Sequence, residues 1–404
     1  MAPMKIPRMS ATKNVFMRNG VDSRKLRIFV SLLEIVNERS LCVPPGCGDI
    51  EMDITEAAKK NAVMKIPRPP LLLLAFAALS LNLFGGAVVP SSYPTIGKIA
   101  KYDNRLDKLI DPDAKIEVIA SGFDWTEGPA WNREGGFLVF SDIPRNRVMK
   151  WSQDEGVSEY MSPSGYTGVV DYGAEPGSNG LVFDSMGRLT LCEHGDRRIA
   201  VVTKNGGKRT LADNFQGKRF NSPNDLVYHS NGNLYFTDPI YGLPKRQDDH
   251  RRELDFCGVY LRKTDGEVVL LTKDFTRPNG IALSPDEKTL YVAQSDTAAP
   301  IWRSYSVRRD GTLGKGKVFY DATKQKQAGG VGNPDGMKVD DQGNLWATGP
   351  GGLYVFSPKG DLLGRLETGE HASNCAWGDD GSTLYITIDM YLCRIRTKAK
   401  GIGF

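Results

Sequence analysis

Six residues with oxygen-bearing side chains recur at one position of a repeated pattern. Each precedes a short apolar strand, a turn and a second apolar strand, which is entered ten residues later in five cases and eleven in one. The six residues are Glu127, Asn179, Asn224, Asn279, Asp335 and Asn374. All six offer hard oxygen donors and two are carboxylates, so the set suits Ca²⁺ first, with Mg²⁺ or Mn²⁺ after it. Two carboxylates held together away from water would also need a cation to neutralise them.

A β-propeller is the architecture that would bring these residues together. The first residue of the second strand is Phe137 in the first unit and Leu384 in the sixth, 247 residues later. Five steps over this distance give a mean period near 49 residues. This period suits four antiparallel strands, and six such units predict an all-β fold, a six-bladed β-propeller over residues 116–402. The innermost strands line the central channel, so the six donors should surround one central divalent-cation site. The alternative is chance recurrence of strand-turn-strand patterns, with Asn and Asp only starting turns.

The second strands run back toward the same end, so their last residues should surround the mouth of this site. Five residues after each second-strand start lie Asp142, His194, Ser295 and Asp389, with Asp238 one residue earlier in its own unit. His194 is one of only four histidines and could bind substrate or transfer a proton. A histidine held by a neighbouring loop carboxylate explains it equally well. Tyr241 and His371 are weaker candidates of the same kind.

Composition excludes several classes of function. The 404 residues are 40% apolar and 25% charged, which excludes wholesale disorder. The net charge of +4 comes from the first 68 residues, because the remaining 336 hold forty basic and forty-one acidic side chains. No nucleic-acid-binding face is therefore expected. The six cysteines include no Cys-x-x-Cys pair, and no Gly-x-Ser-x-Gly turn for a serine nucleophile is present.

The N-terminal residues lie outside the repeat. An apolar run at 71–84 follows a Lys-Ile-Pro-Arg segment and precedes Gly-Gly-Ala, which predicts a signal peptide over 64–90 or an uncleaved signal anchor. The propeller would then be secreted or extracytoplasmic, or held as a single-pass membrane protein whose only membrane contact is this segment. Residues 1–63 are interpreted as a disordered leader or a gene-model extension, and residues 91–115 as a linker.

Short phrases within the repeat carry a specific resemblance. They are Thr-Glu-Gly-Pro-Ala-Trp at 126–131, Asn-Ser-Pro-Asn-Asp-Leu at 221–226, Tyr-Phe-Thr-Asp-Pro at 235–239, Arg-Pro-Asn-Gly at 277–280, Asn-Pro-Asp-Gly-Met at 333–337 and Asn-Cys-Ala-Trp-Gly at 374–378. Over residues 118–396 the chain resembles the gluconolactonase, regucalcin and luciferin-regenerating-enzyme family. The Glu-His-Gly-Asp-Arg-Arg segment at 193–198 is similar to its microbial gluconolactonase branch.

This resemblance implies a six-bladed propeller that holds one divalent cation and hydrolyses sugar lactones. It implies Glu127, Asn279 and Asp335 as metal ligands and Asn224 as a fourth ligand or a substrate contact. It also implies Asp335 as the general base and His194 as a site residue.

The residues and the resemblance together predict a metal-dependent lactone hydrolase. The cation, Ca²⁺ or else Mg²⁺, Mn²⁺ or Zn²⁺, would polarise the lactone carbonyl while Asp335 accepts a proton from water. Asn179, Asn224 and Asp238, with His194, would hold the hydroxyl groups of a small sugar lactone. Two alternatives stay open: a paraoxonase-like lactonase or arylesterase with an apolar substrate, and a non-catalytic binding propeller whose Ca²⁺ only stabilises the fold.

Overall fold

The computed structural model describes residues 92–404, which lie within one compact unit, residues 77–404. The predicted leader at 1–63 and the predicted signal segment at 64–90 lie outside the described residues. Within residues 92–404, no helix is long and apolar enough to cross a membrane. The described residues form six antiparallel sheets of four or five strands and one short two-stranded hairpin.

Four sheets are built from consecutive strands. The first holds β4 (Thr126–Asn132), β5 (Phe137–Asp142), β6 (Arg147–Ser152) and β7 (Gly156–Met161). The second holds β8 (Ser178–Phe183), β9 (Leu189–Glu193), β10 (Arg198–Val202) and β11 (Lys208–Ala212). The third holds β14 (Leu226–Tyr228), β15 (Leu234–Asp238), β16 (Cys257–Arg262) and β17 (Val268–Phe275). The fourth holds β18 (Pro278–Leu283), β19 (Thr289–Gln294), β20 (Ile301–Ser306) and β21 (Lys317–Asp321).

The last two sheets recruit strands from the start of the described chain. The fifth holds β22 (Met337–Val339), β23 (Leu345–Gly349), β24 (Gly352–Phe356) and β25 (Leu362–Glu367), with β2 (Lys98–Lys101) on its edge. The sixth holds β26 (Ala372–Gly378), β27 (Thr383–Ile388) and β28 (Tyr391–Arg396), followed by β3 (Ile116–Ser121) and β1 (Thr95–Ile96). The pairing of β3 with β28 joins the two ends of the sequence in one blade and closes the ring.

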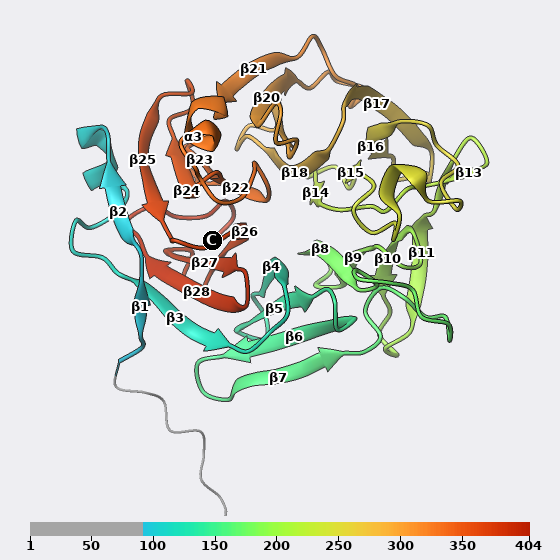
Figure 1. The fold of residues 1–404 in the computed structure, drawn as a ribbon, viewed down its shortest axis with the longest axis horizontal. Coiled ribbons are helices and arrows are strands. Elements are labelled where there is room, and N and C mark those ends of the chain that lie inside the picture. Colours follow the sequence, from blue (N-terminus) through green and yellow to red (C-terminus); the bar gives the residue numbers. More distant parts are fainter. Residues whose placement is uncertain (1–91) are drawn as a thin grey trace, which may run out of the picture. The chain divides into compact units, whose positions relative to one another are not determined.

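The sheets form the predicted six-bladed propeller. Figure 1 shows them around a common centre, and the innermost strands contact one another in the order β4, β8, β14, β18, β22, β26 and back to β4. Four of the six predicted second strands begin at the residue that the repeat indicated, and the strands containing Leu290 and Leu384 begin one residue earlier. The all-β prediction is therefore confirmed.

Aromatic side chains fill the spaces between neighbouring blades. Trp302 of β20 is fully buried and lies 5.3 Å, centroid to centroid, from Tyr354 of β24 in the next blade. Trp131 of β4 stacks on Tyr385 of β27 at 5.6 Å. A large apolar side chain that is fully buried contributes about 1.5–3 kcal/mol by leaving water. This packing holds the blades at a fixed spacing around the axis.

The segment expected to be a linker, 91–115, is part of the folded unit where it is described. β1 pairs with β3, and β2 pairs with β25. The short 3₁₀ helix η1 (Asn104–Lys108) buries Leu106 in the apolar cluster between the last two blades. Lone short strands carry no repeat of their own, so the sequence pattern missed them. The remaining elements, β12 (Asn214–Phe215), β13 (Lys218–Arg219), η2 (Arg246–Asp248) and α3 (Thr323–Gln327), lie in connections.

Candidate active site

One cavity of about 440 Å³ collects five of the six predicted oxygen donors. These five are Glu127, Asn179, Asn224, Asn279 and Asp335. The sixth, Asn374, donates a hydrogen bond from Nδ2 to Oε2 of Glu127 at 3.1 Å. All six side chains belong to residues that are at most 6% exposed. The shared phase of the repeat therefore places the donors together, as the sequence predicts.

Irregular pairing turns the donors toward the cavity. The pairing register of the inner strands shifts between Glu127 and Ala130 in β4, Ser178 and Leu181 in β8, Pro278 and Ile281 in β18, and Ala372 and Asn374 in β26. Asn224 and Asp335 lie two residues before β14 and β22. A local irregularity of this kind aims a side chain out of the usual alternation of a strand. Donors from all six blades can therefore point to one place.

Glycine allows neighbouring inner strands to approach closely at this level. A glycine directly follows four of the donors, at Gly128, Gly180, Gly280 and Gly336. A Cβ atom at Gly128 would collide with the carbonyl oxygen of Asn179, and one at Gly280 with that of Asp335. Only a residue without a Cβ atom fits such a contact with backbone.

Buried hydroxyl groups connect the blades behind the donors. Ser141 of β5 donates from Oγ to the carbonyl oxygen of Asn179 in the next blade at 2.8 Å. Thr237 of β15 donates from Oγ1 to the carbonyl oxygen of Asn279 in the next blade at 2.7 Å. These bonds satisfy buried carbonyl groups where the ladder is interrupted, and they fix the spacing between donors.

The carboxyl groups of the site are costly to ionise without a cation. Burial raises the pKa of Glu127 to about 8 and raises the pKa of Asp335 well above its usual value. The Glu127 and Asp225 carboxylates raise the pKa of Asp335 further. Asp225, buried next to Asn224, has its own pKa raised by burial, and the cationic Lys338 opposes that shift. A bound cation would favour the ionised forms of all three carboxyl groups.

Three oxygen atoms of the site fit a bound cation. Oδ1 of Asn179, Oδ1 of Asn224 and Oδ1 of Asp335 are buried and have no hydrogen-bond partner among the described residues. A buried polar atom left without a partner costs about 1–3 kcal/mol. Nowhere in residues 92–404 is a group of three or more His, Cys, Asp or Glu side chains placed to hold a metal ion. An ion in this cavity would therefore depend on asparagine oxygens as well as on Glu127 and Asp335.

His194, predicted to be catalytic, does not line the cavity. Its ring is fully buried, and Nδ1 lies 3.5 Å from Oε2 of Glu175, which does line the cavity. Burial lowers the pKa of His194 to about 3, so the ring is neutral near pH 7. The structure therefore places His194 behind Glu175 rather than on the cavity wall.

Asp238, predicted to bind substrate, lies away from the cavity wall and serves the backbone. Its Oδ2 accepts the N–H of Asn221 at 2.9 Å, and its Oδ1 accepts the N–H of Ser222 at 2.8 Å. These bonds hold the turn that leads to Asn224. Counting along a strand gives the height of a residue but not the face to which its side chain points, because successive side chains alternate.

The other residues predicted at the rim form two groups: some line the cavity, and the others support it from outside. Ser295, Tyr241 and His371 line the cavity. Asp142 supports the site from outside, because its Oδ1 accepts the backbone N–H groups of Asp124 at 3.1 Å and Trp125 at 3.3 Å. Asp389 contributes backbone, its carbonyl oxygen accepting from Thr126.

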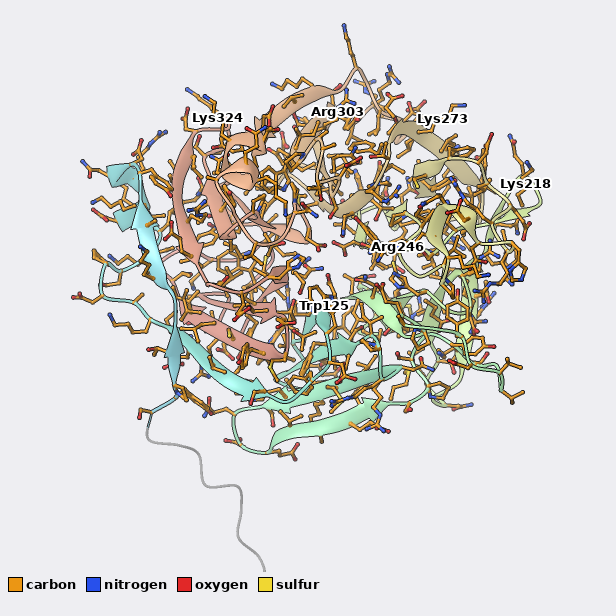
Figure 2. The ribbon with its side chains drawn as sticks, in the orientation of Figure 1. Trp125, Lys218, Arg246, Lys273, Arg303 and Lys324 are labelled. Carbon is orange, nitrogen blue, oxygen red and sulfur yellow. The ribbon has the colours of Figure 1, made fainter. Side chains whose placement is uncertain are left out.

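Eight cavity residues were not found from the sequence. They are Asp124, Trp125, Ile143, Pro144, Ala174, Glu175, Arg246 and Asn333. Figure 2 shows Trp125 and Arg246 near the centre of the ring, whereas the labelled Lys218, Lys273, Arg303 and Lys324 lie toward its periphery. Trp125 and Asn333 each stand two residues before a donor, which is a signal that could have revealed them. Glu175 and Arg246 lie in long connections outside the repeat.

Comparisons with known proteins agree with this fold. A family model described as the SMP-30/gluconolactonase/LRE-like region matches residues 125–389. A gluconolactonase of Zymomonas mobilis is 43% identical over 314 residues, which cover 76% of this chain and 88% of that protein.

Solved structures of related proteins have the same fold. A gluconolactonase from Xanthomonas campestris is 30% identical with a TM-score of 0.64, over 76% of this chain and 99% of that one. A regucalcin from Agrobacterium tumefaciens shares the fold at 18% identity and a TM-score of 0.56, over 77% of this chain and 97% of that one. Since the matched region spans well over half of the chain and includes every predicted oxygen donor, the chain belongs to the SMP-30/gluconolactonase/LRE-like family.

Proposed function

We propose that this protein hydrolyses a sugar lactone with the help of one divalent cation, with Ca²⁺ as the first candidate. The observation that carries the proposal is the single cavity in which unpartnered, buried oxygens of Asn179, Asn224 and Asp335 lie beside Glu127 and Asn279. The relatives named gluconolactonase, at 43% and 30% identity, support a lactone as the substrate.

The cation would be held by Glu127, Asn279 and Asp335, with Asn224 as the fourth donor. When bound, it would polarise the lactone carbonyl and stabilise the negative charge that develops on the carbonyl oxygen. Oxygen-only donors of this kind suit Ca²⁺ better than Zn²⁺.

Asp335 accepts the proton of the attacking water. Its Oδ1 is buried without a partner within the described chain, and the residue lines a cavity of about 440 Å³. The water oxygen adds to the carbonyl carbon, the ring C–O bond breaks, and the ring oxygen leaves as a hydroxyl group after it receives the proton that Asp335 took from the water, which gives an open-chain hydroxy acid. Asn179 orients the substrate in this scheme. His194 acts only through Glu175, as a positioning residue.

The test is a pH-stat assay of the purified protein with two lactones. We expect D-glucono-δ-lactone to be hydrolysed with a higher kcat/KM than a long-chain acyl lactone, because carboxylate, amide and guanidinium groups line the cavity and can bind the hydroxyl groups of a sugar ring. Preference for the acyl lactone would favour the paraoxonase-like alternative. Turnover of neither lactone in the metal-loaded protein would favour the non-catalytic binding propeller. Secretion, predicted from residues 64–90, is part of the same proposal and is tested separately by locating the protein in cell fractions.

A further inference from the structure

A cationic side chain without a partner faces the candidate cavity. Arg246, in η2 between β15 and β16, is exposed and lines the cavity. Within residues 92–404 its guanidinium group has neither a hydrogen bond nor an ion pair, and it lies over the Tyr241 ring, 5.5 Å from the centroid. The five N–H donors of this group are therefore free for a ligand.

The loop that carries Arg246 is fixed rather than loose. Arg246 has φ 50°, a left-handed conformation that a non-glycine residue adopts at a cost. Asp249 holds this conformation: its buried carboxylate accepts the N–H of Lys245 at 3.1 Å and pairs with Arg251 at 2.9 Å. Nearby, Leu243 is buried in a small apolar cluster. The structure thus keeps a strained arginine in place at the cavity.

An acidic side chain lines the same cavity from a different blade connection. Glu175, between β7 and β8, has a side chain that is 30% exposed, and its Oε2 lies 3.5 Å from the buried His194 ring. Burial raises the pKa of Glu175 to about 7, and the charge of Arg246 opposes this shift. Glu175 can therefore accept hydrogen bonds from a ligand, while Arg246 can donate them.

Aromatic rings complete this set. Trp125 lies against His371 with the ring planes 79° apart and the centroids 4.8 Å apart, and Tyr241 lies beside Arg246. Flat apolar surfaces combined with a few charged donors and acceptors suit a ring that carries several hydroxyl groups.

We propose that Arg246 and Glu175 bind the hydroxyl groups of the substrate and make the site selective for hydroxylated lactones over apolar lactones of the same ring size. This inference rests on the proposed function and adds to it the residues that select the substrate. A site built to hydrogen-bond a substrate hydroxyl rejects an analogue that lacks it, because its polar groups are then left unpaired.

Arg246 could instead bind the carboxylate of the product, and this role would change the turnover of the lactones in a different way. An arginine that captured the carboxylate of the product would act equally on every lactone, since ring opening always releases a carboxylate. An arginine that binds hydroxyl groups acts only on lactones that carry them. The two roles are therefore separated by comparing lactones of equal ring size.

The experiment measures kcat/KM of the full chain for D-glucono-δ-lactone and for δ-valerolactone, a six-membered lactone without hydroxyl groups. We expect Arg246→Met to lower the value for gluconolactone by about 10- to 100-fold, the range for losing a hydrogen bond to a charged group, and to leave valerolactone nearly unchanged. Glu175→Gln should act in the same direction, and Arg246→Lys should recover part of the loss. The matched control is Lys245→Met, because this neighbouring exposed lysine does not line the cavity.

Two results would overturn the inference. An equal fall in kcat/KM for both lactones in Arg246→Met would assign the arginine to the carboxylate, and unchanged values for both lactones would remove it from substrate binding. A wild-type protein that hydrolyses neither lactone would instead defeat the proposed function itself. Melting curves of each variant exclude unfolding as the cause of a loss, since Arg246 is exposed and replacing it should not affect stability.

Discussion

The donor side chains of the site are common residue types, and their surroundings determine what each one can bind. Asp335 is almost fully buried, its Oδ1 has no partner in the described chain, and Glu127 lies close enough to raise its pKa. Asp340 is also a fully buried aspartate, but its Oδ2 accepts Nε1–H of Trp346 at 3.0 Å and Nδ2–H of Asn344 at 2.9 Å. The first arrangement leaves an oxygen for an ion and water, while the second uses its oxygens to hold the fold.

These two aspartates allow a matched test. Asp335→Asn should lose Ca²⁺ binding and lower kcat/KM by about 10²- to 10⁴-fold, because it removes both a ligand and the proposed base. Asp340→Asn should lower the melting temperature but leave kcat/KM nearly unchanged. Calorimetric titration with Ca²⁺ and the pH-stat assay check both variants. Retained binding and turnover in Asp335→Asn would exclude this residue from both roles.

His194 should make stability depend on pH. Burial lowers its pKa to about 3 in the folded protein, against a usual value of about 6.5 when unfolded. The unfolded chain therefore takes up a proton first as the pH falls, and stability that is complete above pH 6.5 is lost progressively toward pH 3. At pH 5 the loss due to this group should be about 2 kcal/mol.

Urea unfolding of wild type and His194→Gln at pH 8 and pH 5 measures this loss. The variant should be less stable at pH 8 but should lose less stability on acidification than the wild type. An identical loss in both proteins would show that His194 does not titrate on unfolding.

Among the secondary-structure elements, the inner strands determine the geometry of the site most directly, because their irregular starts aim the donors toward the cavity. Gly280 in β18 illustrates the constraint, since a Cβ atom there would collide with the carbonyl oxygen of Asp335 in the next blade. The strand can bring Asn279 close to Asp335 only if the following residue has no side chain.

Gly280→Ala should separate these two strands and weaken the site. The expected cost is about 1–3 kcal/mol in unfolding free energy, as for overpacking in a core, with Ca²⁺ affinity lowered as well. Gly207→Ala is the control, because Gly207 is in an exposed turn where the nearest atom to an added Cβ, Oγ1 of Thr203, is 3.4 Å away. Equal melting temperatures and equal Ca²⁺ affinities for the two variants would contradict this account.

The sequence predicts the features that belong to the repeat, but not the residues that lie outside it. Six strand pairs with a common phase were enough for the blade number and for the position of the donors, because repeated units must be packed alike. Residues outside the repeat, such as Glu175 and Arg246, were not predicted, because the path of a long connection depends on tertiary contacts. His194 was predicted at the rim from its height and from the resemblance, and Asp238 from its height. The structure places His194 behind Glu175, and Asp238 binds the backbone of Asn221 and Ser222.

At the scale of the whole molecule, ring closure and the site depend on each other. Strand β3 from the start of the described chain pairs with β28 near its end, so donors from six blades meet only when the ring is closed. An ion that binds only the closed ring would stabilise it, by about 2.7 kcal/mol at a concentration one hundred times its Kd. The buried carboxyl groups of Glu127, Asp225 and Asp335 make an empty site electrostatically unfavourable.

The most direct measurement is turnover of D-glucono-δ-lactone by the purified full chain before chelation, after complete removal of metal, and after Ca²⁺ is added back. We expect hydrolysis to fall to the uncatalysed rate in the stripped protein and to return on addition of Ca²⁺, because in the proposed mechanism a cation held by Glu127, Asn279 and Asp335 polarises the lactone carbonyl. Full turnover in a protein that elemental analysis shows to be metal-free would contradict the proposed mechanism.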